Sequence, residues 1–217
     1  MVQTASAQIL SAQREQDALF PGEGKTALTV WTGIPYIGIA EYAYGFSDRF
    51  SVSVIGGFTP SSKAIGIRLR GIVAQPSDKF RLYIKGPILY YPGSEDSHGE
   101  PWFFAWPTLN AEWRLESGIR IWGGAGLAGA ICAQNLLGIK DAAMEMGGEG
   151  FTGGLWNTLS AGISKPITEH IELHAEAAIV MRGLKFANDP SLPGKRTNIY
   201  WGTRLPMIVD IGMSYAF

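Results

Sequence analysis

The sequence predicts an all-β fold, a single antiparallel barrel of about ten strands. From residue 25 onward apolar residues recur with a period of two, which a half-buried strand requires and a helix cannot use. Short and long connections alternate along the chain, as in an antiparallel meander in which alternate connections lie at the same rim. The length of 217 residues suits one domain, because β-barrels often reach about 250 residues as a single unit.

The first half of the chain predicts five strands, at residues 25–34, 36–46, 50–59, 63–74 and 80–91. In the second of these, Tyr42, Tyr44 and Phe46 alternate with small residues. In the fourth, isoleucine and leucine alternate with glycine and arginine, and in the fifth, apolar residues alternate with basic ones and a tyrosine. Short turns at 47–49 and 75–79 separate these strands and therefore share one rim.

The second half predicts five more strands, at residues 102–115, 118–130, 151–165, 170–182 and 198–217. The alternation is clearest in 171–179, where the odd positions are Ile, Leu, Ala, Ala and Ile and most even positions between them are Glu or His. Short turns fall at 116–117 and 166–169, and long connections at 92–101, 131–150 and 183–197. An even number of strands places both termini at the short-turn rim.

Two properties predict that this barrel spans a membrane: the composition of the chain, and the volume of the apolar stripes formed by apolar residues at alternate strand positions. Only 17% of the residues are charged, against about 25% in an average soluble domain. The apolar stripes would overfill the interior of a small barrel, whereas the Gly, Ser, Ala and scattered charges of the other face fit a filled polar lumen. Aromatic residues gather near strand ends, as Phe46 does with Phe50. We expect the stripes to face lipid; a soluble lipocalin-like barrel is the alternative.

The last strand resembles that of a known class of proteins. Residues 211–217 read Ile-Gly-Met-Ser-Tyr-Ala-Phe, an alternating segment that ends on an aromatic residue. This segment resembles the C-terminal strand of bacterial outer-membrane β-barrels, which the barrel-insertion machinery recognises. The resemblance covers residues 25–217 at the level of architecture and implies an integral outer-membrane protein. It makes Tyr215 and Phe217 the candidate insertion signal, and outer-membrane lipid, the insertion machinery and other envelope proteins the candidate partners.

The N-terminal residues 1–24 are expected to form a leader or a periplasmic segment ahead of the barrel at 25–217. Small residues at 4–8 resemble the end of a signal-peptide cleavage site, which fits an exported protein. Residues 1–20 could form an amphipathic helix at the periplasmic rim, a plug in the lumen or a disordered leader. A formal net charge of −1 argues against a nucleic-acid partner. The single cysteine, Cys132, excludes an internal disulfide.

Charged side chains on the strands are costly in lipid, so we expect them to point into the lumen and to pair there. The expected lumen-lining set is Glu41, Arg68, Arg70, Arg81, Lys85, Glu112, Arg114, Arg120, Glu172, His174, Glu176, Arg182, Arg204 and Asp210. Eight of these residues are basic and five are acidic. If a passage remains in the lumen, this basic surplus favours anions.

Two sequence patterns suggest a ligand site, and each has a simpler explanation in a barrel. Gly124, Gly126 and Gly129 match the dinucleotide pattern G-x-G-x-x-G, which needs a buried parallel strand and a helix behind it. In a barrel wall, glycines instead allow bending and close packing. Residues 22–26 resemble the end of a phosphate-binding loop, but they lack its first glycine and precede a strand.

Acidic and histidine residues form a third pattern, at alternate positions of the strand 170–182. His170, Glu172, His174 and Glu176 share one strand face, where neighbours lie about 7 Å apart, so other strands would have to complete a metal site. A ladder of charges facing lumen arginines is the simpler interpretation. We therefore expect neither a metal nor a cofactor.

Three classes of function remain open for such a barrel. A narrow passive pore is the leading hypothesis, because about ten strands leave a lumen largely filled by its own side chains and disfavour a wide porin. The alternatives are a structural or partner-binding subunit and an enzyme with a site on the long connections. Acids and a histidine do gather there, at Glu95, Asp96, His98, Glu100, Asp141, Glu145 and Glu149. Nothing arranges them as nucleophile, base and orienting group, so no catalytic role is expected.

Overall fold

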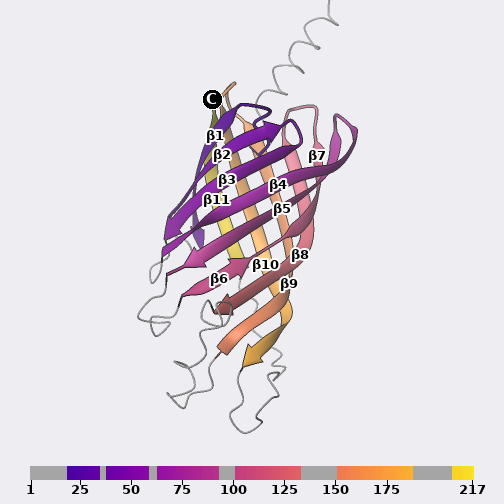
Figure 1. Cartoon of the computed structure of the whole chain (residues 1–217). Coiled ribbons are helices and arrows are strands. Elements are labelled where there is room, and N and C mark those ends of the chain that lie inside the picture. The colour runs from indigo at the N-terminus through magenta and orange to yellow at the C-terminus, as the bar shows by residue number, and fades with distance from the viewer. Residues whose placement is uncertain (1–18, 35–37, 59–62, 93–100, 133–150, 188–206) are drawn as a thin grey trace, which may run out of the picture.

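The computed structural model describes residues 19–34, 38–58, 63–92, 101–132, 151–187 and 207–217. Every described strand pairs with antiparallel neighbours on both sides, and the pairings β1 with β11 and β4 with β5 close the sheet on itself (Figure 1). The predicted antiparallel barrel of about ten strands is therefore confirmed. The elements are β1 Thr26–Ile34, β2 Gly38–Ser47, β3 Phe50–Phe58, β4 Lys63–Ser77, β5 Phe80–Tyr91, β6 Trp102–Ala105, β7 Thr108–Arg114, β8 Arg120–Cys132, β9 Phe151–Pro166, β10 Ile171–Ala187 and β11 Met207–Ala216.

The predicted strand 102–115 is interrupted, and this part of the prediction was wrong. Both β6 and β7 pair with β5 on one side and β8 on the other, so together they occupy one position in the barrel wall. The interruption falls at Trp106 and Pro107, since a proline nitrogen cannot donate to the ladder. Trp106 still donates its backbone N–H to the Pro87 carbonyl at 3.0 Å, which keeps the wall joined beside the break.

Two strands are longer than predicted. β4 continues through Gln75 and Pro76 to Ser77, because irregularities in its register after Ile72 and Ala74 accommodate the unpaired residues. β10 continues to Ala187 in the same way, with a register shift between Val180 and Gly183. The connection predicted to begin at residue 183 therefore begins after Ala187. Residues 198–206 of the predicted last strand lie outside the described residues.

The short turns and the C-terminus lie at one rim of the barrel (Figure 1). Aromatic side chains cluster beside these turns: Phe46 lies 5.0 Å from Tyr44 and 6.1 Å from Phe50 between ring centroids, and Phe80 lies 4.9 Å from Trp113. The same rim holds the terminal Phe217, 4.8 Å from Tyr215. Such a girdle suits the boundary between hydrocarbon and water.

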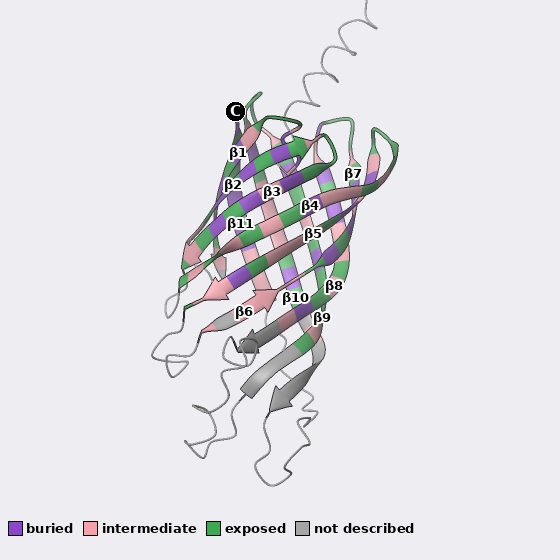
Figure 2. Ribbon diagram, in the orientation of Figure 1, coloured by how far each residue is buried: buried purple, intermediate pink, exposed green. Residues whose placement is uncertain are grey.

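Burial alternates along most of the described strands, and most of the exposed positions are apolar (Figure 2). Ile211 is 62% exposed between buried Asp210 and Gly212, and Leu173 is 45% exposed beside Glu172 at 4%. A water-soluble barrel would place these side chains inside, so the exterior is built to face lipid. Among the described residues, no helix is long and apolar enough to cross a membrane.

Candidate functional site in the barrel lumen

Buried ion pairs line the lumen, and the densest group joins β2 to β4. Glu41 lies 2.6 Å from Arg68 Nη1 and 2.5 Å from Arg70 Nη2, and its side chain is 1% exposed. These residues come from strands that flank β3, so the arginines reach over that strand. Arg70 also donates to Ser53 Oγ of β3 at 2.7 Å. The small serines of β3 therefore leave space for the long side chains above them.

Two further pairs lie nearer the short-turn rim. Arg81 of β5 faces Glu112 of β7 in the register, and their side-chain atoms lie 2.7 Å apart. Arg120 of β8 contacts Glu172 of β10 across β9 and donates to Ser164 Oγ of β9 at 3.2 Å. All four charged groups are less than a tenth exposed. A buried charge without a partner is strongly unfavourable. Loss of one member of either pair would therefore destabilise the filled lumen.

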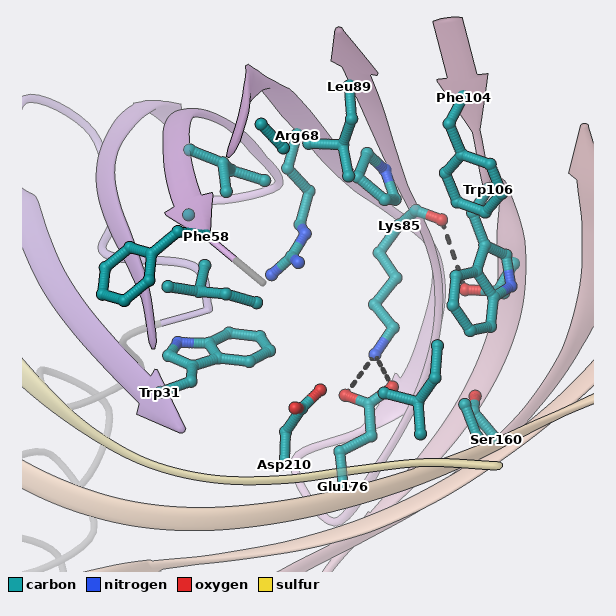
Figure 3. Close-up of a pocket in the computed structure, with 18 residues that line it drawn as sticks. Trp31, Phe58, Arg68, Lys85, Leu89, Phe104, Trp106, Ser160, Glu176 and Asp210 are labelled. Carbon is teal, nitrogen blue, oxygen red and sulfur yellow. Dashed lines mark hydrogen bonds and ion pairs between the residues drawn. The ribbon is translucent and has the colours of Figure 1, made fainter. Parts of the chain in front are cut away.

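One ion pair crosses the lumen. Lys85 Nζ of β5 lies 2.5 and 2.6 Å from the two carboxylate oxygens of Glu176 on β10. Strand β5 borders β4, β6 and β7, whereas β10 borders β9 and β11, so this contact joins opposite walls. Figure 3 shows the lysine extending over the interior to the glutamate. Trp31 of β1 narrows the same level, with the Arg68 guanidinium 4.7 Å above its ring.

Two cavities follow one another along the lumen. The outer cavity holds about 90 Å³ of space for the centres of water-sized molecules, and the inner cavity, nearer the short turns, holds about 20 Å³. Both are lined by Trp31 and Glu176, which therefore form the partition between them. Leu19 lines the inner cavity, so the chain ahead of β1 bounds that end.

Phe20 fills the lumen at the short-turn rim. Its ring is 6% exposed, lies edge-on to Tyr83 at 5.6 Å and stands 4.7 Å beneath the Arg81 guanidinium. Ser51 of β3 donates its hydroxyl to the Leu19 carbonyl at 3.0 Å, which anchors this segment. Of the arrangements open for residues 1–20, the described residues 19 and 20 fit a plug in the lumen; residues 1–18 lie outside the description.

The structure brings most of the predicted lumen residues together. Arg114 is half-buried on the same face of β7 as Glu112, and Asp210 is 9% exposed and lines the outer cavity. The side chain of Arg182, and all of Arg204, lie outside the described residues. Of the eight basic residues predicted, six therefore belong to the described lumen, with all five acids.

The even-numbered positions of the strand 170–182 hold separate contacts. Glu172 and Glu176 pair with the cations described above, whereas His174 packs its ring 5.2 Å from Trp31. His170 is exposed and stacks on Tyr215 at 5.6 Å. The described residues contain no group of three or more His, Cys, Asp or Glu side chains placed to hold a metal ion. The acids and the histidine of the long connections lie outside the described residues.

Two glycines of the G-x-G-x-x-G pattern, Gly124 and Gly126, allow close approach of the neighbouring chain segment. A Cβ on Gly124 would lie 2.2 Å from Asn110 Oδ1, and one on Gly126 would lie 2.1 Å from the Pro107 carbonyl oxygen. Both glycines lie in β8, opposite β7 in the antiparallel sheet. Around β8, the described residues thus provide neither the parallel strand nor the packed helix that a dinucleotide site needs.

Aromatic residues of the lumen were absent from the expected set. Trp31, Tyr83 and Trp122 are each less than a tenth exposed and point inward. The alternation along each strand could have identified them. In β1 the odd-numbered positions face inward, and Trp31 shares them with Ala27 and Thr29. The alternation had placed Tyr83 on the face of Arg81 and Lys85, and Trp122 fits inside because Gly162 on β9 leaves room for its ring.

Solved structures with a similar fold include three bacterial outer-membrane β-barrels. The N-terminal β-barrel domain of OprF from Pseudomonas aeruginosa is 10% identical, with a TM-score of 0.38 over 90% of this chain and 99% of that one. OprG from the same species is 12% identical, with a TM-score of 0.37 over 93% and 99%. Neisserial surface protein A is 12% identical, with a TM-score of 0.29 over 89% and 94%. No family model and no curated protein matches the sequence.

Proposed function

We propose that this chain is an integral barrel of the bacterial outer membrane and forms a narrow passive route for small solutes, closed in the conformation described. The observation that carries the proposal is the series of two cavities along the lumen, divided by Trp31 and Glu176. A barrel that served only as a scaffold would have no need of internal space arranged along its axis. The role is non-enzymatic: the solute crosses unchanged.

Two constrictions close the proposed route. The first is the partition, where the Lys85–Glu176 pair crosses the lumen beside Trp31. The second is the Leu19–Phe20 segment at the short-turn rim, which is the periplasmic side in an outer-membrane barrel. The partition depends on the long flexible side chains of Lys85 and Glu176 beside Trp31, and the contacts described for the segment are made by side chains of the wall, among them the Ser51 hydroxyl. Both constrictions can therefore open without loss of strand pairing.

Single-channel recording in planar lipid bilayers tests this proposal. The wild-type barrel should show small, infrequent openings. Replacing Trp31 and Phe20 together by alanine removes one aromatic from each constriction and should raise the mean conductance several-fold. Trp113→Ala is the matched control, because this tryptophan is 51% exposed on the outer face and lines neither cavity.

The control separates a change in the lumen from a change in the wall. Conductance that rises in the double variant and not in Trp113→Ala supports the route. If neither the wild type nor a folded double variant shows openings, the barrel does not conduct, and a structural or partner-binding role takes the place of the proposed route.

A further inference from the structure

The outer cavity combines an apolar wall with polar atoms that have no hydrogen-bond partner among the described residues. Its lining includes Ile39, Ile55, Phe58, Leu89 and Phe104, contributed by four different strands. Such a lining is typical of sites for small molecules, in which a few polar groups fix the orientation of an apolar body. The cavity lies in the half of the lumen that faces the long connections.

Asp210 is the polar group best placed to receive a ligand. It is 9% exposed, and among the described residues its Oδ1 atom is buried without a hydrogen-bond partner. In Figure 3 its carboxylate points into the cavity between Trp31 and the Lys85–Glu176 pair. Ser160, 8% exposed on the far side, also has a buried hydroxyl oxygen without a described partner. A buried acceptor of this kind favours a molecule that brings a donor.

The charges around the cavity are balanced without a ligand. The described cations at this level are Arg68, Arg70 and Lys85, and the described anions are Glu41, Glu176 and Asp210. A charged ligand would leave an uncompensated charge in a buried site, which is strongly unfavourable. The balance therefore favours an uncharged hydrogen-bond donor, and a hydroxyl group is the simplest of these.

We infer that the outer cavity is a binding site for a small uncharged amphipathic molecule, a phenol or a short aromatic or aliphatic alcohol whose hydroxyl group donates to Asp210. The apolar body of the molecule lies against Ile55, Phe58 and Leu89. Because one water occupies roughly 10–15 Å³ by the same measure, the cavity suits about six to nine non-hydrogen atoms. Binding needs no open path to the periplasm, so it extends beyond the proposed route and does not depend on it.

Titration of the intact barrel with benzyl alcohol tests this inference. In a ¹⁵N-labelled sample, the indole N–H signal of Trp31 reports binding in the outer cavity. Each dissociation constant is calculated from the concentration of ligand that is free in water. The probes of equal shape are ethylbenzene, which lacks the hydroxyl, and benzylammonium and benzoate, which carry charge. Benzyl alcohol should shift the Trp31 signal and saturate, and the two charged probes should bind at least about tenfold more weakly.

Two variants identify the site. Asp210→Leu keeps the size of the side chain and removes the acceptor, so the affinity for benzyl alcohol should fall about tenfold relative to that for ethylbenzene. Ala178→Leu, at a position that lines the cavity and is 4% exposed, fills the space and should abolish binding of both probes. If Asp210→Leu does not fold, Ala178→Leu and the comparison of probes still test whether an uncharged molecule binds in the outer cavity.

The results that would overturn the inference are distinct from those that would overturn the proposed route. Unsaturable shifts, or saturation unchanged in Ala178→Leu, would show that the alcohol partitions into detergent and not into the cavity. Tighter binding of benzylammonium would refute an uncharged ligand. If the barrel conducts after removal of its constrictions but does not bind benzyl alcohol, the proposed route stands and the binding site is refuted. If the barrel does not conduct but binds benzyl alcohol, the binding site stands and the proposed route is refuted.

Discussion

Glu41 is the acidic residue of the densest group of ion pairs in the lumen. Its carboxylate pairs with both Arg68 and Arg70, and its side chain is buried. Removing one member of a buried ion pair costs about 3–5 kcal/mol, because the remaining charge is left without compensation. Glu41→Gln should therefore lower the free energy of unfolding by about that amount, measured by denaturant titration of the barrel in lipid vesicles.

Glu116 provides the matched comparison at the surface. It pairs with Lys79 at 3.0 Å, but the two side chains are 88% and 69% exposed. Exposed pairs contribute about 0–1 kcal/mol, so Glu116→Gln should be nearly neutral in the same titration. Equal losses in the two variants would contradict the account of a buried, charge-paired lumen.

Gly162 is a residue at which the close approach of two strands can be tested. A Cβ at this position would lie 2.3 Å from Trp122 Cζ2, since the indole of β8 lies over its register partner on β9. Gly162→Val should displace the indole and destabilise the barrel by about 1–3 kcal/mol, the usual cost of overpacking. Ala161→Val, on the outer face of the same strand, should change stability little; urea titration of both distinguishes them.

At the scale of single strands, the depth of a residue in the membrane decides the cost of a charge. Leu159 is 45% exposed near the middle of β9, whereas Leu173, equally exposed, lies two residues after the start of β10 at the short-turn rim. An arginine costs about 2–4 kcal/mol at the midplane and about 0–1 near an interface. Leu159→Arg should therefore destabilise the barrel more than Leu173→Arg in lipid vesicles; the opposite order would contradict the orientation of the wall.

The final strand supports a prediction about assembly. Phe217 is 64% exposed and Tyr215 is 41% exposed on the outer face of the barrel, where another protein can reach them. If they form the insertion signal, Phe217→Asp should sharply reduce the amount of folded barrel in outer-membrane fractions while export across the inner membrane continues. Equal amounts of folded variant and wild type would remove Phe217 from that role.

The presence of most strands, and the side to which their residues point, could be predicted from the sequence because the period of two is a local property. Strand ends could not. Pro107 interrupts a segment whose alternation continues on both sides, and Pro76 lies within β4 because a bulge accommodates it. The charges expected in the lumen follow from the cost of charge in lipid, and those of them that are described lie on the inward face of the strands. The sequence could not identify the partners: Lys85 and Glu176 are 91 positions apart, and only closure of the barrel sets them opposite each other.

At the scale of the whole molecule, we expect a weak preference for anions if the barrel conducts. The described lumen holds six basic and five acidic side chains of the predicted set. Reversal potentials in a salt gradient should therefore show modest anion selectivity in the conducting Trp31→Ala, Phe20→Ala barrel. Adding Arg68→Gln and Arg81→Gln leaves four basic groups against five acids and should shift the preference toward cations. Selectivity that stays unchanged would place the conducting path away from these arginines.

The central claim is that the apolar face of the wall meets lipid and the polar face meets the lumen. Nitroxide scanning along residues 157–163 of β9 tests it most directly, with one cysteine introduced at a time into a Cys132→Ser background in lipid vesicles. Collision with oxygen, which concentrates in hydrocarbon, should be high at Leu159, Ala161 and Ile163 and low at Thr158 and Ser160, repeating every second residue. Uniform access to a water-soluble relaxation agent, or high oxygen access at Ser160 and low access at Leu159, would contradict the account.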